Sequence, residues 1–295
     1  MHRALYEQAI ARGIRVEHGK RLVAAEDTGD GVRAVFADGT EAAGDLLIGC
    51  DGVHSAVRGV IDPGAPAPSY AGLLNTGGFT RGIAVDGEPG GYEMIFGRRA
   101  FFGYAAAPDG EAWWFANVPS RREPARPAPQ AFDAAEWRSR LLALFADDAG
   151  PAVELIASTA ELLPASPVHA IPHLPRWHRG RMVVLGDAAH APSPSSGQGA
   201  SLAIEDAVAL GRCLRDEDDA RVAFARFEAV RRPRVERIIK WAARINNAKA
   251  PGPIGRAVRD ATLPAILRLT ADSKAQRQIY EHEIAWDTPA AAPAC

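Results

Sequence analysis

The sequence has few cysteines and no strong excess of either charge. Three cysteines, Cys50, Cys213 and Cys295, occur in 295 residues, and their spacing matches neither a metal site nor a disulfide framework. The 34 basic and 36 acidic residues give a net charge of −2, so the sequence predicts no surface for nucleic acid or for a membrane. These features are typical of a reducing compartment, and we expect a cytoplasmic protein.

Long apolar segments are also missing. No run of residues stays apolar over the roughly 20 positions that a membrane-spanning helix needs. Apolar residues still make up 47% of the chain and charged residues 24%, which is the balance of a folded globular protein. A length of 295 residues allows one large domain or two smaller ones.

A third absence concerns nucleotide binding. Rossmann folds hold the pyrophosphate of a dinucleotide on a G-x-G-x-x-G turn between a strand and a helix. No such turn occurs in this sequence. A Rossmann-like unit built by this chain would therefore be incomplete.

The most informative segment that is present covers residues 181–199. Residues 182–185 form a short apolar run with two valines, which predicts a buried strand. Gly186 and Asp187 follow at its carboxyl end, the edge of an open α/β sheet where ligands collect. A carboxylate at that edge can accept hydrogen bonds from the hydroxyls of a ribose or a ribityl chain.

A loop and a helix are predicted after Asp187. Residues 191–199 contain two prolines, two glycines and three serines, so their backbone can approach a ligand closely. From Ala200 to Leu214 the apolar residues recur with a helical period. The amino end of such a helix offers free N–H groups and a partial positive charge, which favours an anionic ligand.

A second segment repeats this arrangement. Residues 46–50 predict another buried strand, and Asp51 and Gly52 stand at its carboxyl end. Because both strands end in a glycine and a carboxylate, the two edges could flank one ligand.

Together the two segments resemble those of the class A FAD-dependent aromatic monooxygenases related to para-hydroxybenzoate hydroxylase. The residues similar to the family's DG motif are Asp51, Gly52, Ser55 and Arg58. The residues similar to its GD motif are Gly186, Asp187, Pro194, Gly197, Gln198 and Gly199. The order and separation of the motifs also match, and two ordered motifs are far more specific than one short glycine pattern.

The resemblance implies a fold. We expect an α/β chain with an incomplete Rossmann-like FAD-binding domain, an inserted antiparallel β-sheet substrate domain and C-terminal helices. The FAD-binding domain would comprise residues 1–62 and 166–215. The substrate domain would comprise residues 63–165, and the C-terminal helices residues 216–295.

Local patterns add individual elements to this fold. The predicted elements are a hairpin at 32–41, an antiparallel sheet within 70–118, and helices at 136–147, 220–241 and 254–269, the last broken by Pro264. The resemblance adds a short strand at Ile14–Val16.

The resemblance also implies roles for single residues. Asp187 would hold the ribityl chain or ribose of FAD, and residues 194–199 would line the isoalloxazine. Asp51 with Arg58 would support the phosphates and the encounter with the nicotinamide nucleotide, while Arg3 would approach the FAD phosphates and ribose.

Each of these roles has a plainer alternative. Asp187 could cap a loop, Asp-Gly at 51–52 is also a common turn, Arg58 could cap a helix, and Arg3 could be exposed. The cluster of arginines at 231–234 is interpreted as a solvated, salt-bridged helix face rather than as a phosphate site.

The expected function is hydroxylation of a small aromatic or phenol-like substrate. In such enzymes NAD(P)H reduces FAD, and the reduced flavin takes up O2 to give a C4a-hydroperoxide that hydroxylates the ring. Because the cofactor carries this chemistry, no catalytic or metal-binding side chain is predicted, and His190 is interpreted as structural. The alternatives are a related flavin reductase or halogenase and a non-catalytic remnant that acts as a binding module, and homo-oligomer formation stays open.

The resemblance also bears on the start of the chain. Family members open with the glycine-rich βαβ unit, so Met1 lies where a relative would already be about a hundred residues in. We therefore expect a fragment, or a chain started at an internal methionine, rather than a natural minimal protein. Whether such a chain binds FAD is an open question at this point.

Overall fold

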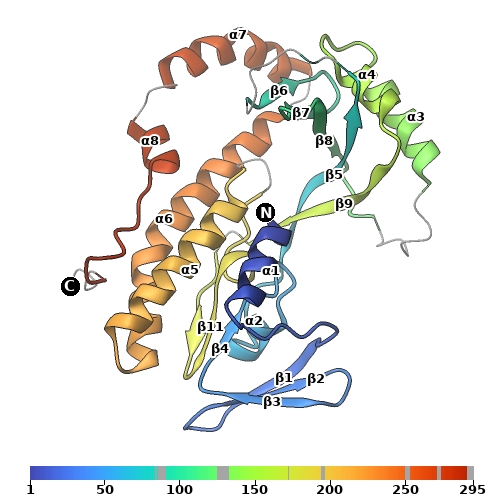
Figure 1. The fold of residues 1–295 in the computed structure, drawn as a ribbon. Helices are drawn as coiled ribbons and strands as arrows, with labels where there is room; N and C mark the ends of the chain where they lie inside the picture. Colours follow the sequence, from blue (N-terminus) through green and yellow to red (C-terminus); the bar gives the residue numbers. More distant parts are fainter. Residues whose placement is uncertain are drawn as a thin grey trace.

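The computed structural model describes residues 1–83, 85, 91–124, 133–171, 173–193, 197–249, 253–270 and 274–290. Within these ranges the chain forms three β-sheets, with helices packed against two of them (Figure 1). The α/β fold class predicted from the sequence is confirmed, since a small sheet with parallel strands is joined to a larger antiparallel sheet.

The small sheet carries both sequence motifs. Its strands lie in the order β10 (His178–Arg179), β11 (Met182–Val184) and β4 (Leu47–Gly49). β11 and β4 are parallel, so their carboxyl ends meet at one edge of the sheet. Both predicted strands are confirmed, and β11 is buried along its whole length. The predicted burial of β4 is wrong, because this strand lies at the edge of the sheet with Leu47 half-buried and Ile48 exposed.

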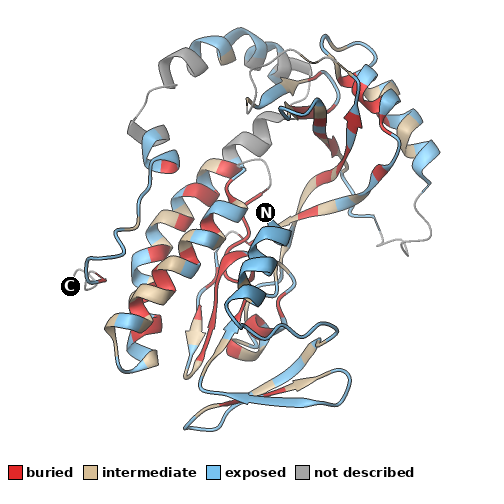
Figure 2. Cartoon of the chain, viewed as in Figure 1, coloured by how far each residue is buried: buried red, intermediate tan, exposed pale blue. Residues whose placement is uncertain are grey.

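Helices enclose this sheet. α2 (Ala56–Ile61) follows β4, while α5 (Gly199–Asp216) and α6 (Ala220–Lys249) lie side by side as a long pair (Figure 1). Their buried side chains alternate with exposed ones, and the buried stripes face the interior (Figure 2). The shared core includes Ile61, Trp177, Val183, Leu202, Leu210, Phe224 and Phe227.

A three-stranded antiparallel meander precedes the motif sheet. Its strands are β1 (Leu22–Asp27), β2 (Val32–Phe36) and β3 (Glu41–Gly44). The predicted hairpin is confirmed, and Gly39 takes the positive φ of +80° that its turn requires.

The amino-terminal segment is exposed. α1 (His2–Ala11) has no buried residue and is almost entirely pale blue in Figure 2. The predicted strand at Ile14–Val16 is wrong, because these residues form an irregular connection. A strand needs a hydrogen-bonded neighbour, and no described strand pairs with this segment.

The inserted unit is a five-stranded antiparallel sheet. Its spatial order is β6-β7-β8-β5-β9, which confirms the predicted antiparallel sheet. The bounds are β5 (Ser69–Arg81), β6 (Glu93–Phe96), β7 (Phe101–Ala106), β8 (Glu111–Pro119) and β9 (Leu162–Ala170). β9 was not predicted because it contains two prolines, which a strand tolerates at a sheet edge. It continues past residue 165, and the domain boundaries themselves stay a prediction.

Two helices cover one face of this sheet. They are α3 (Ala134–Phe145), close to the predicted 136–147 helix, and α4 (Ala152–Ser158). The buried Trp114 packs here against Phe102 with ring centroids 5.3 Å apart, and its Nε1 atom donates to Thr159 Oγ1 at 2.8 Å. The opposite face of the sheet carries exposed aromatic side chains.

The C-terminal helices are longer than their predicted ranges. α6 runs through Pro233, and α7 (Pro253–Thr270) runs through Pro264, so the predicted break in this helix is wrong. A proline removes one helical hydrogen bond and often only bends a helix. α8 (Lys274–Tyr280) follows. Across the described residues, no helix is both long and apolar enough to cross a bilayer.

The packing of β4 against α2 predicts the effect of one substitution. A Cβ atom on Gly49 would lie 2.6 Å from Cβ of the buried Val57 and 2.9 Å from Cγ1 of Val184. Gly49→Ala should therefore lower the free energy of unfolding by about 1–3 kcal/mol in urea denaturation. Gly59→Ala is the matched control, because this exposed helix position has open space around it and should gain about 0.5–1 kcal/mol. Equal stabilities of the two variants would contradict the packing argument.

Candidate functional site

The two motifs meet at the carboxyl edge of the small sheet. The N–H of Leu185 donates to the carbonyl of Gly49 at 3.1 Å, which extends the strand pairing one residue beyond β11. Cys50 and Asp51 continue from β4 at this point, and Gly186 and Asp187 continue from β11. The sequence expectation that both motifs flank one edge is therefore confirmed by the parallel pairing.

Asp51 caps α2. Its carboxylate accepts hydrogen bonds from Ser55 Oγ at 2.5 Å and from the N–H groups of Ala56 and Val57 at 2.7 and 3.1 Å. These N–H groups belong to the first turn of the helix, which has no internal partners for them. Gly52 makes the turn before the helix with a φ of +79°. The Asp-Gly turn of the plainer alternative is present, the capping of α2 by Asp51 is an additional finding, and contact with a cofactor stays a prediction.

Arg58 joins the two motifs. Its buried guanidinium donates from Nη1 to the carbonyl of Ala188 at 3.0 Å and from Nη2 to the carbonyl of Val53 at 2.8 Å. Burial lowers the pKa of this guanidinium, although Asp51 works in the opposite direction. The side chain thus links the DG turn to the GD turn. Its contact with the phosphates of FAD stays a prediction.

Asp187 stands at the end of β11 within a tight turn. Gly186 begins the 3-10 turn η2 (Gly186–Ala188) with a φ of +57°. The Asp187 side chain is exposed, and no described residue donates a hydrogen bond to it. The protein around the carboxyl still desolvates it enough to raise its pKa, and His190 partly opposes this effect. Among the described residues of this edge, the Asp187 carboxylate is thus available to accept hydrogen bonds from a ligand.

The amino end of α5 lies beside Asp187. A Cβ atom on Gly199 would be 3.8 Å from Asp187 Oδ1. Gln198 precedes the helix, and the first turn of α5 has neither a side-chain cap nor an acidic residue. Gly197 has a φ of +63° with open space around it, while Pro194 lies outside the described residues. The helix end therefore presents N–H donors next to the free carboxylate.

Arg3 stands apart from this edge. Its side chain is 89% exposed and pairs with Glu7, one turn further along α1, at 2.8 Å. The structure shows it as a surface residue, and its predicted approach to FAD stays a prediction.

Two charged residues of the site were missed in the sequence. Asp206 on α5 is fully buried, and Arg231 on α6 is 2% exposed and binds it through Nε at 2.7 Å. A signal existed, because Asp206 lies four residues after Leu202 and four before Leu210, on the apolar stripe of the helix. A charge on that stripe indicates a buried ion pair. The salt bridges predicted for the arginine cluster at 231–234 are confirmed. The predicted exposure of this cluster to solvent is wrong for Arg231, which is buried.

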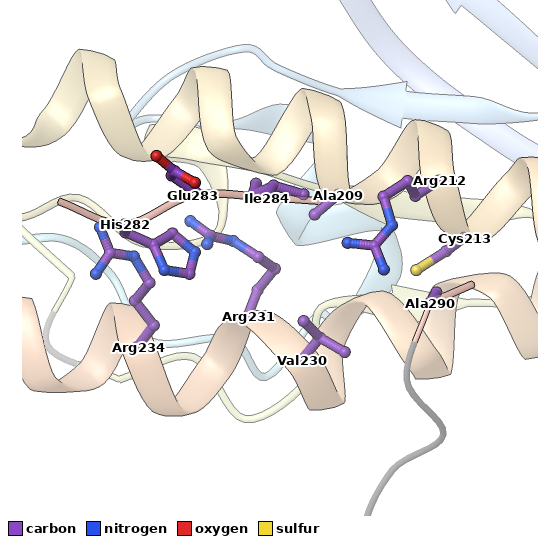
Figure 3. A pocket seen from close by; sticks show the side chains of 10 residues that line it. All are labelled: Ala209, Arg212, Cys213, Val230, Arg231, Arg234, His282, Glu283, Ile284 and Ala290. Carbon is purple, nitrogen blue, oxygen red and sulfur yellow. The ribbon is translucent and has the colours of Figure 1, made fainter. Parts of the chain in front are cut away.

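A cavity of about 170 Å³ lies further along α5 (Figure 3). Its walls come from α5, α6 and the segment after α8, and Arg231 and Arg234 point into it from α6. Both arginines already pair with Glu205. The cavity is below the size of ordinary small-molecule sites, so it is not a candidate for a dinucleotide. The lining residues are Ala209, Arg212, Cys213, Val230, Arg231, Arg234, His282, Glu283, Ile284 and Ala290.

Comparison with known sequences identifies similar proteins. Residues 1–242 match the model of the FAD binding domain family. FAD-dependent urate hydroxylase of Klebsiella pneumoniae is 36% identical over 230 residues, which cover 76% of this chain and 57% of that protein. Aurachin C monooxygenase/isomerase of Stigmatella aurantiaca is 33% identical over 250 residues, which cover 83% and 60%. The chain thus spans less than two thirds of the length of these relatives.

Solved structures show the same similarity. Klebsiella pneumoniae HpxO, crystallised with FAD and uric acid, superposes with a TM-score of 0.76 at 30% identity, covering 94% of this chain and 68% of that one. A salicylate hydroxylase substrate complex superposes with a TM-score of 0.70 at 21% identity, covering 95% and 75%. The second similarity concerns the fold alone.

The position of Arg58 predicts a loss of stability when its charge is removed. Arg58→Met keeps the apolar stem but leaves the carbonyls of Ala188 and Val53 without these donors. The free energy of unfolding should fall by about 3 kcal/mol in urea denaturation, since hydrogen bonds from charged groups are strong and buried carbonyls need partners. Arg3→Met is the control, and it should leave stability unchanged because exposed ion pairs contribute little. An Arg58→Met variant as stable as the wild type would show that these two hydrogen bonds contribute little to stability.

The buried charge of Asp206 predicts a dependence of stability on pH. Burial alone raises the pKa of Asp206, but His190, Arg231 and the N–H of Gly186 together hold it below the usual value. A lowered folded pKa means that the stabilisation is present above the unfolded value of about 3.9 and is lost as the pH falls through the folded pKa. Asp206→Asn should therefore be less stable than the wild type by about 3–5 kcal/mol at neutral pH, and the difference should shrink below pH about 4.

Urea denaturation of both proteins at a series of pH values measures this difference. The exposed Asp45→Asn is the control and should track the wild type throughout. A difference that stays constant under acid conditions would contradict the assigned charge of Asp206.

Proposed function

Because the chain belongs to the FAD binding domain family of class A aromatic monooxygenases, we propose that it forms the flavin-holding and substrate-holding part of an FAD-dependent hydroxylase of small aromatic compounds. One observation carries this proposal. The free carboxylate of Asp187, the uncapped amino end of α5 and the DG turn converge at one edge of a sheet with parallel strands.

The residues at this edge fit a flavin nucleotide. Asp187 offers two acceptor oxygens for ribityl or ribose hydroxyls, and the N–H groups of α5 suit negative charge on a flavin ring. Gly197 and Gly199 carry no side chain that would block a close approach. FAD bound here would supply electron transfer from NAD(P)H and activation of O2, while the chain binds it, orients it and excludes water.

The open face of the five-stranded sheet suits an aromatic substrate. Phe115 stacks on Tyr92 with centroids 6.0 Å apart and rings 3° from parallel, and Trp113 lies 5.5 Å from Phe115. On the same face, Asn117 Nδ2 donates to Asn75 Oδ1 at 2.8 Å. Flat rings stack favourably on such side chains, and the half-buried amide of Asn75 can bind a polar substituent. We infer that the substrate is a small ring compound with a hydroxyl or carbonyl group.

A second candidate function is that of a binding module. β4 is an edge strand of its sheet, and α1 exposes Leu5 and Ile10. An unpaired edge and exposed apolar side chains favour association with a protein. Light scattering after size exclusion tests self-association through this edge, and a monomer at all concentrations would contradict it.

The proposed function predicts binding of FAD by the 295-residue chain. A titration followed by flavin fluorescence should show stoichiometric binding, and Asp187→Ala should weaken it by about tenfold or more, since it removes hydrogen bonds to the cofactor's hydroxyls. The control is Asp45→Ala, an exposed carboxylate that precedes β4 and belongs to neither motif. Holo-protein should then oxidise NADH or NADPH faster when a phenol is added.

Cys50 gives an independent readout of the same site. This exposed thiol follows β4 next to Asp51, and partial desolvation by the surrounding protein, with a contribution from Asp51, raises its pKa. FAD should slow its alkylation by iodoacetamide, measured by peptide mass spectrometry. A folded chain that neither binds FAD nor protects Cys50 would contradict the proposed function.

A further inference from the structure

Asp206 receives three hydrogen bonds inside the protein. Its Oδ2 atom accepts from the backbone N–H of Gly186 at 2.9 Å and from Nε2 of His190 at 2.5 Å. Its Oδ1 atom accepts from Nε of Arg231 at 2.7 Å. A carboxylate can only accept, so Nε2 of His190 must carry the proton.

The two donors on Oδ2 stand at the two ends of one turn. Gly186 begins the turn, and the N–H of His190 donates to the carbonyl of Gly186 at 2.8 Å to close it. Asp187 lies between them with its side chain exposed. Asp206 therefore holds both ends of the backbone that carries Asp187.

Arg231 keeps this carboxylate in place. It extends from α6 toward α5 (Figure 3), and its Nη2 atom also pairs with Glu205 at 2.8 Å. Both carboxylate oxygens of Glu205 are bound by Arg234 at 2.7 Å. The hydrogen bonds and ion pairs of Glu205 go to neighbours other than the turn, so it belongs to the same charge network without holding Asp187.

A neutral side chain of the same shape cannot replace Asp206. Asparagine has one acceptor oxygen, and its NH2 group would face either Arg231 or the donors of the turn. A buried donor would then lose its partner, which costs more than the bond contributes on average. The site requires a carboxylate rather than any polar group.

We propose that Asp206 is a positioning residue for the flavin: by holding the ends of the Gly186–His190 turn, it sets the direction in which Asp187 meets the cofactor. This inference rests on the proposed function. It assigns the buried ion pair a role in cofactor affinity as well as in stability.

The test compares Asp206→Asn with Glu205→Gln. Both remove one negative charge from the same arginine network, but only Asp206 holds the turn. At a temperature where both are folded by circular dichroism, Asp206→Asn should weaken FAD binding by about tenfold or more, while Glu205→Gln stays within about threefold of the wild type. Equal affinities of the two variants would overturn the inference, because the effect would then belong to the network as a whole.

A second pair covers the case in which Asp206→Asn does not fold. His190→Gln keeps an N–H donor for Asp206, whereas His190→Leu fills similar space without one. We expect His190→Gln to bind FAD nearly as the wild type does and His190→Leu to bind it several times more weakly. Indistinguishable affinities of these variants would also overturn the inference.

Amide hydrogen exchange separates this inference from the proposed function. The N–H of Gly186 should exchange at least about tenfold faster in Asp206→Asn than in the wild type, and at the wild-type rate in Glu205→Gln. Failure of the wild type to bind FAD, with this exchange pattern observed, would contradict the proposed function and leave the holding of the turn supported. An unchanged Gly186 amide in Asp206→Asn would overturn the inference whether or not FAD binds.

Discussion

The edge that carries both motifs depends on the guanidinium of Arg58. It binds the carbonyl of Val53, 5 residues before it, and the carbonyl of Ala188, 130 residues after it, and no described acid forms an ion pair with it. A buried cation is costly unless it is hydrogen-bonded, so this side chain is favourable only while both turns are in place. The fold therefore couples the shape of the DG turn to that of the GD turn through one residue.

A second constraint acts on the same turn from the opposite direction. Gly186 and Asp187 follow β11 at the edge of the sheet. The carboxylate of Asp206, on α5, accepts a hydrogen bond from the N–H of Gly186. Three contacts thus fix the backbone between Leu185 and His190: strand pairing at Leu185, the guanidinium of Arg58 and the carboxylate of Asp206. No described residue donates a hydrogen bond to the Asp187 side chain. Such an arrangement suits a residue whose function is to meet a ligand in a fixed geometry.

Most of the elements could be predicted from local sequence patterns. The strands at the motifs, the hairpin, and α3, α5 and α6 follow from apolar periodicity and turn residues, which are local signals. The strand at Ile14–Val16 failed because pairing depends on a distant partner, and β9 was missed because its prolines hide an edge strand. Pro264 was given too much weight, since a single proline often only bends a long helix.

The candidate site could be located from the sequence but not built from it. Motif residues indicated the right edge, whereas the hydrogen bonds of Asp51 and Arg58 to the protein itself depend on tertiary packing. Asp206 carried a readable signal on its apolar stripe, but its partner Arg231 lies 25 residues further along the chain. No local pattern pairs two such residues.

The parallel pairing of β4 with β11 also has a kinetic consequence. The strands are separated by the whole inserted sheet, so their contact closes a very long loop. Contacts between residues distant in sequence form slowly. Within the insertion, β6, β7 and β8 pair with near neighbours, and β5 pairs with β8 and β9 over shorter separations than β4 with β11. We expect the insertion to fold first as a unit and the motif edge to form last. The protein would then become able to bind a ligand at this edge only at the end of folding. The edge would also be the first part to unfold when the protein is destabilised.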